Sequence, residues 1–83
     1  MLFQIIQSHD SVVCKDVRSI YQKRAGEKLA CEGTNVLSAV VSRPEHTHWF
    51  VVEAESQEAL ERFCEPFREF VSTRIVPVGN LLD

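Results

Sequence analysis

Imidazole and thiol side chains, which bind metal ions and transfer protons, gather at a few points of this sequence. His9 and Cys14 are five residues apart, and His46 and His48 stand at the head of the apolar run WFVV. Neutral imidazole and thiolate suit Zn²⁺ and similar ions, and a site with three protein ligands keeps a further position for water or substrate. His9, Cys14 and His46 are therefore candidate ligands of a divalent metal such as zinc.

The same side chains have two other interpretations. A thiol at a helix N-terminus ionises readily to the nucleophilic thiolate, so Cys14 could act as a nucleophile with His9 as its base. Histidines at strand ends more commonly cap turns or form surface hydrogen bonds, and the sequence contains no recognised short metal motif. The choice between these interpretations depends on which elements bring the residues together.

The first part of the chain predicts a strand followed by a helix. Residues 2–8, LFQIIQS, are rich in Leu, Phe and Ile and lead into His-Asp-Ser, where Asp10 or Ser11 can cap a helix. This helix should fade near Gly26, and residues 27–34 form a connection of unassigned shape. Apolar side chains at i, i+4, i+7 and i+8 give the helix one buried stripe: Val13, Val17, Ile20 and Tyr21.

The rest of the chain predicts a hairpin, a second helix and a last strand. Residues 35–42 and 46–54 form strands two and three, joined by the turn at Arg43–Glu45. Ser56 caps the second helix, which Pro66 should kink or end, and the last strand covers residues 71–78. The buried stripe of the second helix is expected to consist of Ala59, Leu60, Phe63, Cys64 and Phe67.

This order of elements, βαββαβ, predicts a single α+β domain, residues 1–83, with the ferredoxin-like fold. Its four-stranded antiparallel sheet has the order 4-1-3-2 and carries both helices on one face. Strand four is then an edge strand, as Pro77 requires. Strands one and three are adjacent and antiparallel, so His9 should approach His46, and the start of the first helix should bring Cys14 near both.

Both sides of the predicted sheet are apolar, although two helices can cover only one of them. Strand three contains Trp49, Phe50, Val51 and Val52 in succession, and strands one and two are similar. A small domain with an uncovered apolar sheet face gains burial by association. We therefore expect a homodimer, packed sheet against sheet, that closes an α+β barrel around a small cavity.

A second candidate site follows from strand alternation. If Phe50 and Val52 face the helices, then Trp49 and Glu53 face the dimer cavity. A carboxylate in such a cavity would be desolvated and could serve as a general base, whereas at the strand end it could be solvated or paired with Arg74. Gln4 and Tyr21 are further candidates for contact with a ligand.

Composition excludes several classes of function. The chain has 83 residues, a net charge of −3 and 25% charged residues, which gives no basic surface for nucleic acid. No apolar run is long enough to span a membrane and no leader pattern is present, so we expect a cytoplasmic protein without nucleic-acid or membrane partners. Three widely spaced cysteines argue against a disulfide framework, and the glycine-rich nucleotide motifs are absent.

The chain resembles the dimeric α+β barrel superfamily, in particular its small uncharacterised single-domain members. The resemblance rests on MLFQIIQSH, RPEHTHWFVVEAES, QEALERFCEPF and RIVPV, which together span nearly the whole chain. It implies the fold and the dimer, and the small members are similar in their placement of His9, Cys14 and His46. The superfamily includes cofactor-free monooxygenases, lactone isomerases, haem-degrading proteins and dehydratases, so fold alone does not select an activity.

Three hypotheses remain open. The leading one is a small homodimeric barrel protein that binds a small ligand or metal ion near His9, Cys14 and His46 or in the barrel cavity. The second is a cofactor-independent monooxygenase or isomerase for a small aromatic or lactone-like substrate, with Glu53 or His9 as base and Trp49 as an apolar wall. The third is a ligand-sensing regulatory domain, which the absence of glycine from the first strand-to-helix turn disfavours.

Overall fold

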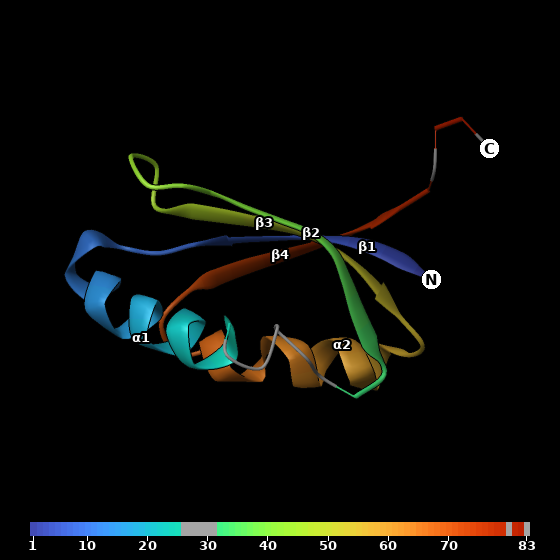
Figure 1. Ribbon diagram of the computed structural model, residues 1–83, viewed down its shortest axis with the longest axis horizontal. Helices are drawn as coiled ribbons and strands as arrows, with labels where there is room; N and C mark the ends of the chain where they lie inside the picture. Colours follow the sequence, from blue (N-terminus) through green and yellow to red (C-terminus); the bar gives the residue numbers. More distant parts are fainter. Residues whose placement is uncertain (26–31, 80, 83) are drawn as a thin grey trace.

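The computed structural model describes residues 1–25, 32–79 and 81–82, and it shows a four-stranded antiparallel sheet with both helices on one face (Figure 1). The sheet order is β2-β3-β1-β4, which is the predicted 4-1-3-2 order read from the other edge. The elements are β1 Leu2–Ser8, η1 Ser11–Val13, α1 Cys14–Ala25, β2 Thr34–Ser42, β3 Thr47–Ala54, α2 Gln57–Cys64, η2 Glu65–Phe67 and β4 Ser72–Val78. The ferredoxin-like fold is thus confirmed.

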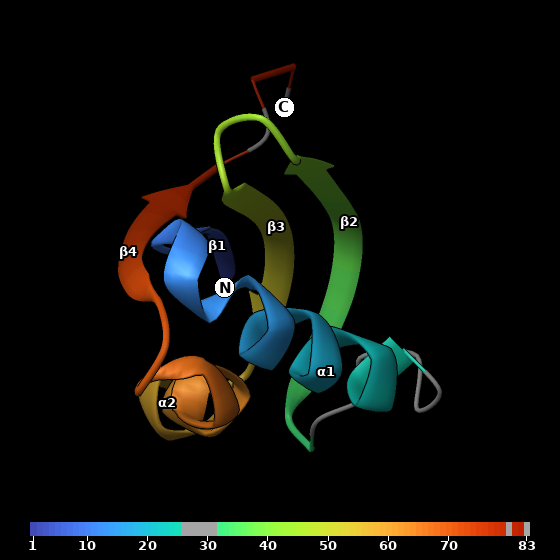
Figure 2. The ribbon, with the colours of Figure 1, turned by 90° about the vertical axis from the view of Figure 1, so that its left-hand side faces the viewer.

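The core lies between the sheet and the two helices. Figure 2 shows α1 beneath β3 and β2, and α2 on the side of β4. The whole predicted stripe of α2 is buried, and alternate residues of β1 and β3 meet it. The fully or almost fully buried apolar side chains of the described residues are Phe3, Ile5, Val17, Phe50, Val52, Ala54, Ala59, Leu60, Phe63, Cys64 and Phe67.

The helix ends follow the predicted local chemistry. Asp10 caps η1, the 3₁₀ turn that leads into α1, through a hydrogen bond from the Val12 N–H, and the Ser56 hydroxyl accepts from the Ala59 N–H at 3.1 Å. Pro66 lies in the short 3₁₀ turn η2, directly after α2 ends at Cys64. β4 is an edge strand, the position in a sheet where proline is tolerated, and it contains Pro77.

Four boundaries differ from the sequence prediction. The chain enters α1 through a 3₁₀ turn rather than directly, β2 begins at Thr34 and β4 begins at Ser72. His46, expected to open the third strand, is instead the last residue of the turn, and β3 begins at Thr47. Most of the unassigned connection, residues 27–31, lies outside the described residues.

A β-bulge in β2 decides which of its side chains face the helices. The pairing with β3 shifts between Val36 and Ser38, so one residue is left over at this point. Beyond the bulge Ala39 pairs with Phe50 and Val41 pairs with His48, on the helix side of the sheet. Without the bulge, strand alternation would turn Ala39 and Val41 to the opposite face.

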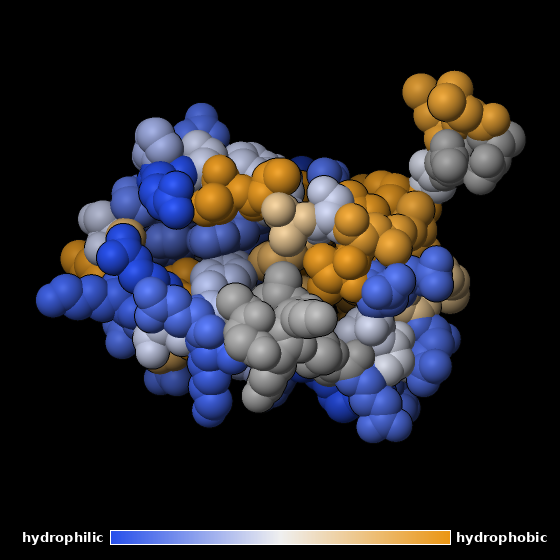
Figure 3. Space-filling model, viewed as in Figure 1, coloured by the Kyte–Doolittle hydropathy of each residue, from blue (hydrophilic) through white to orange (hydrophobic). Residues whose placement is uncertain are grey.

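No helix or strand of the described residues covers the other face of the sheet. Trp49 and Val51 of β3 lie on it, with Val40 of β2 beside Trp49, and Val40 is 57% exposed. Figure 3 shows apolar surface over the sheet and a largely hydrophilic surface over the helices. The described residues contain no helix that is long and apolar enough to cross a membrane.

Candidate metal and ligand site

The backbone brings two histidines together at one end of the sheet. β1 and β3 pair in register from Leu2–Glu53 to Ser8–Thr47. One step further, the His9 N–H donates to the His46 carbonyl oxygen at 3.0 Å. This hydrogen bond extends the antiparallel pairing past both strand ends and places the imidazole rings with their centroids 5.2 Å apart.

His46 has a backbone conformation that ordinary residues avoid. Its φ angle is 51°, and among the described residues it is the only one other than glycine with a positive φ. The left-handed region costs an L-residue roughly 1–2 kcal/mol, and glycine is the usual occupant. The turn is closed by a hydrogen bond from the His46 N–H to the Arg43 carbonyl at 3.2 Å. A strained histidine at this position points to a role for its side chain.

Cys14 reaches the two imidazoles from the first residue of α1. Its Sγ atom lies 3.4 Å from Nε2 of His9 and 3.2 Å from Nδ1 of His46. The Asp10 cap fixes the 3₁₀ turn that positions this residue: the Asp10 carboxylate accepts from the Val12 N–H, and its carbonyl accepts from the Val13 N–H. Three separate parts of the chain therefore present one donor atom each to a common point.

These donor atoms have the spacing of a zinc site. All three lie within 4.8 Å of one another. Zn–S and Zn–N bonds of about 2.3 and about 2.0 Å at a tetrahedral angle place sulfur and nitrogen about 3.5 Å apart. The two measured sulfur–nitrogen distances, 3.4 and 3.2 Å, are close to this value. The residues present thus fit a divalent metal with one position left open.

Burial favours the neutral, metal-binding form of His9. Desolvation lowers the pKa of His9 below its usual value, and the neighbouring His46 lowers it further, while Asp10 acts in the opposite direction. Nδ1 of His9 is buried and has no hydrogen-bond partner among the described residues, consistent with this desolvation. A histidine must be deprotonated at the nitrogen that binds a metal, so a lowered pKa assists binding at neutral pH.

A pocket of about 410 Å³ adjoins the three donor atoms. It lies between α1 and the helix-facing side of β2 and β3, and its volume is in the range of about 300–1,000 Å³ typical of small-molecule sites. His9, Cys14 and His46 form part of its wall. The other lining residues are Val17, Arg18, Tyr21, Ala39, Val40, Val41, Ser42, Arg43, His48 and Phe50.

Stacked rings form the inner wall of this pocket. Tyr21 of α1 stacks on His48 of β3 with ring centroids 4.2 Å apart, and its hydroxyl donates to Oε1 of the buried Gln7 at 2.7 Å. Desolvation, followed by the effect of His9, lowers the pKa of His48 to about 4. At neutral pH His48 is therefore an uncharged aromatic wall rather than a cation.

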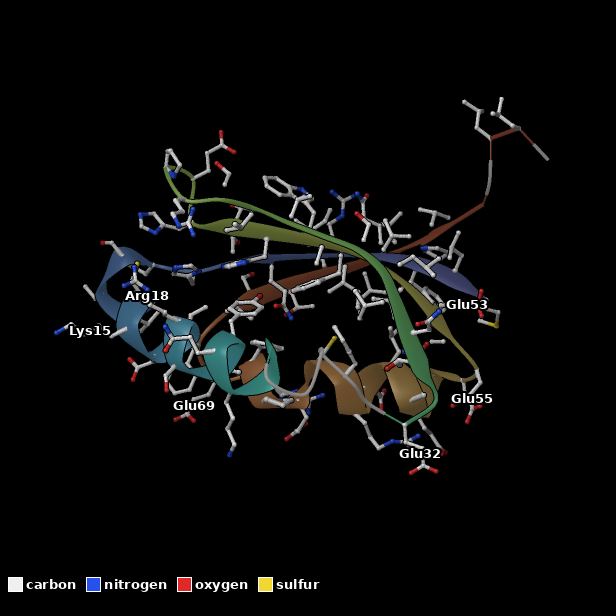
Figure 4. All side chains as sticks on the ribbon, in the orientation of Figure 1. Lys15, Arg18, Glu32, Glu53, Glu55 and Glu69 are labelled. Atoms are coloured by element: carbon white, nitrogen blue, oxygen red, sulfur yellow. The ribbon has the colours of Figure 1, made fainter. Side chains whose placement is uncertain are left out.

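The other predicted contact residues lie elsewhere. Glu53 is exposed on the uncovered face of the sheet, at the other end of the molecule from Arg18 (Figure 4). Gln4 and Trp49 are on the same uncovered face, as their pairings with Val51 and Val40 require. The structure thus brings His9, Cys14, His46 and Tyr21 to one pocket and leaves Glu53, Gln4 and Trp49 outside it.

Two pocket residues were missed by the sequence analysis, Arg18 and Arg43. The helical spacing offered a signal for the first, since Cys14, Arg18 and Tyr21 recur at i, i+4 and i+7 on one helix face. Arg43 belongs to the same turn as His46, so the site that uses one of them has the other nearby.

Comparison with known proteins places the chain in a family. A family model matches residues 1–81. The chain belongs to the family described as Domain of unknown function (DUF3303). No curated protein matches the sequence of this DUF3303 domain.

Two solved structures share the fold of this DUF3303 domain. A crystal structure of an antibiotic biosynthesis monooxygenase is 16% identical with a TM-score of 0.58, and the match covers 98% of this chain and 99% of that one. Protein Atu4242 from Agrobacterium tumefaciens is 11% identical with a TM-score of 0.56, covering 98% and 96% of the two chains. The likeness confirms the ferredoxin-like architecture.

Proposed function

We propose that this protein binds a divalent transition metal such as Zn²⁺ through His9 Nε2, Cys14 Sγ and His46 Nδ1. The observation that carries the proposal is the position of the sulfur atom, 3.4 and 3.2 Å from two imidazole nitrogens that belong to different parts of the chain. The open coordination position would face the adjoining pocket, where a small ligand can reach it. The protein is then a small-ligand-binding metalloprotein.

Zinc titration by calorimetry, on protein freed of metal with a chelator and kept reduced, tests this proposal. We expect binding of one Zn²⁺ per chain. Loss of a residue that only supports a ligand costs about 10- to 100-fold in metal affinity, so His9→Ala, Cys14→Ser and His46→Ala should each cost at least that much. Cys64→Ala removes a thiol buried in the core and is the control, with zinc affinity unchanged. Absence of stoichiometric zinc in the parent protein would refute the proposal.

A second candidate is supported by the fold shared with the antibiotic biosynthesis monooxygenase. In this alternative the chain is a cofactor-independent oxygenase or isomerase for a small aromatic or lactone-like substrate. His9, neutral at pH 7 and part of the pocket wall, is better placed as its base than the exposed Glu53. Consumption of dissolved O₂ by metal-free protein with small phenols, abolished in His9→Ala and retained in Glu53→Gln, would favour this function over metal binding.

We also infer that two copies associate through the uncovered sheet face. At its centre Trp49 lies between Ile6 and Val40, with Val51 beyond it on the same strand, and none of the described helices covers these side chains. A domain of 83 residues gains the most from such additional burial. The metal site and pocket lie on the opposite side of the sheet, so association would leave them accessible.

A further inference from the structure

The pocket wall carries fixed positive charge and no acid. Arg18 reaches it from α1 and Arg43 from the β2–β3 turn, while none of the lining residues is Asp or Glu. Within the described residues, neither guanidinium lies within ion-pair distance of a carboxylate. Figure 4 shows that Lys15, by contrast, points away from the molecule. Guanidinium groups stay charged at any physiological pH and bind carboxylates in a bidentate manner.

The body of the same pocket is apolar and flat. Val17 and Phe50 are almost fully buried beneath it, and the stacked rings of Tyr21 and His48 form a planar wall. Arg18 lies one helical turn after Cys14 and Arg43 belongs to the same turn as His46, so the cationic groups lie at the end of the pocket that holds the three donor atoms. An apolar chamber with charge at one end suits a ligand with an apolar body and a charged head.

Metal binding would add to the positive charge of the pocket and so favour an anionic ligand. Zn²⁺ bound to one thiolate and two neutral imidazoles keeps one net positive charge, to which the two guanidinium groups add theirs. A ligand that supplies a negative group to the open metal position is therefore favoured over a neutral one.

We propose that the pocket takes a small carboxylate with an aromatic or branched aliphatic body. The carboxylate occupies the open position of the metal held by His9, Cys14 and His46 and accepts hydrogen bonds from Arg18 and Arg43. The body lies between α1 and β2–β3, against the Tyr21 ring. This assignment of a ligand class rests on the metal binding proposed above, and it requires no chemical change in the ligand.

Calorimetric titration of the zinc-loaded protein with benzoate, at constant ionic strength, tests the inference. Benzamide is the neutral analogue of the same shape, and inorganic phosphate is the anion without an apolar body. We expect benzoate to bind at least about tenfold more tightly than either, since charge-assisted hydrogen bonds are about twice as strong as neutral ones. In Arg18→Gln/Arg43→Gln the preference for benzoate over benzamide should shrink to about threefold or less.

Three further measurements distinguish failure of the carboxylate inference from failure of the metal proposal. Arg68→Gln changes an exposed arginine directly after η2 and should leave benzoate affinity as in the parent protein. Zinc affinity and the thermal midpoint of the double arginine variant should also match the parent, because neither guanidinium is a metal ligand. Equal affinity for benzoate and benzamide, tighter binding of phosphate, or an unchanged preference in the double variant would overturn the inference while the metal proposal stands. Failure of zinc to bind would overturn both.

Discussion

At the scale of single residues, the position of His46 is the feature that most distinguishes the site. It combines a left-handed backbone, a carbonyl bonded to the His9 N–H and an imidazole nitrogen 3.2 Å from Cys14 Sγ. Glycine would fit the backbone without strain, so the presence of histidine makes its side chain a candidate for a functional role. The approach of His9 and His46 was predictable from antiparallel pairing. The φ angle was not, because a turn of this length has several closures that the sequence Arg-Pro-Glu-His permits.

The strain at His46 can be measured with two substitutions that both remove the imidazole. His46→Ala keeps a Cβ atom in the left-handed conformation, whereas His46→Gly does not. We expect His46→Ala to be less stable than His46→Gly by about 1 kcal/mol in metal-free urea denaturation. Equal stability of the two variants would show that the turn stores no strain.

His48 should make the metal-free protein less stable in mild acid. Its pKa is about 4 in the folded chain and 6.5 in the unfolded chain, mainly because folding removes the ring from water. Between these values the unfolded chain binds a proton that the folded chain does not, so stability is complete above pH 6.5 and falls as the pH drops towards 4. By pH 5 the expected loss is about 1–2 kcal/mol relative to pH 7.

His48→Phe isolates this contribution, because phenylalanine can keep the stack on Tyr21 and has no proton to bind. His9 remains in both proteins and contributes equally to their pH dependence. Urea denaturation at pH 7 and pH 5 should show a smaller loss for the variant than for the parent. Parallel losses in the two proteins would contradict a depressed His48 pKa.

At the scale of elements, the α1 stripe and the β2 bulge together shape the pocket. Periodicity predicted the two helices, their caps and the edge position of β4, since these depend on local chemistry and on the twofold alternation of strands. The bulge between Val36 and Ser38 had no signal in the apolar run NVLSAVVS, in which every register buries similar side chains. The pocket therefore had to be seen in the structure, because Ala39 and Val41 reach its wall only as a result of the bulge.

Gly33 directly precedes β2 and packs against Ala59 of α2. Of the two glycines that the structure describes, it has the less space for a side chain. Its φ is 83°, and a Cβ atom there would lie 2.8 Å from the Cβ of the buried Ala59. We expect Gly33→Ala to lower the free energy of unfolding by about 1–3 kcal/mol, since both the backbone and the contact are strained.

Gly79→Ala is the matched control, because a Cβ atom there meets nothing within 4 Å. Its stability should stay within about 0.5 kcal/mol of the parent protein in the same urea denaturation. Similar stabilities for the two alanine variants would mean that α2 can move away from Gly33 without cost.

At the scale of the whole molecule, the sheet separates two different surfaces. The helix side holds the core, the cluster of His9, Cys14 and His46 and the pocket, whereas no described helix covers the other side. Composition and order of elements were enough to predict this division, because two helices cannot cover both faces of four strands. They could not locate the pocket on the helix side, which depends on distances between side chains.

If two copies associate through the uncovered face, a charged side chain placed on that face should prevent dimer formation. Val51→Lys places an ammonium group at the centre of that face, between the neighbours Gln4 and Ser38, where burial against a second copy would be costly. Sedimentation equilibrium should give a dimer for the parent protein and a monomer for this variant. Gln22→Lys adds the same charge on the exposed side of α1 and should remain dimeric. A parent protein that stays monomeric at micromolar concentration would contradict the inference.

The central claim, that one sulfur and two imidazole nitrogens hold a metal, is tested most directly by X-ray absorption at the zinc edge of the zinc-loaded protein. We predict one sulfur neighbour at about 2.3 Å and nitrogen or oxygen neighbours at about 2.0–2.1 Å. The sulfur contribution should disappear in Cys14→Ser. A first coordination shell of nitrogen and oxygen only, in the parent protein, would contradict the account.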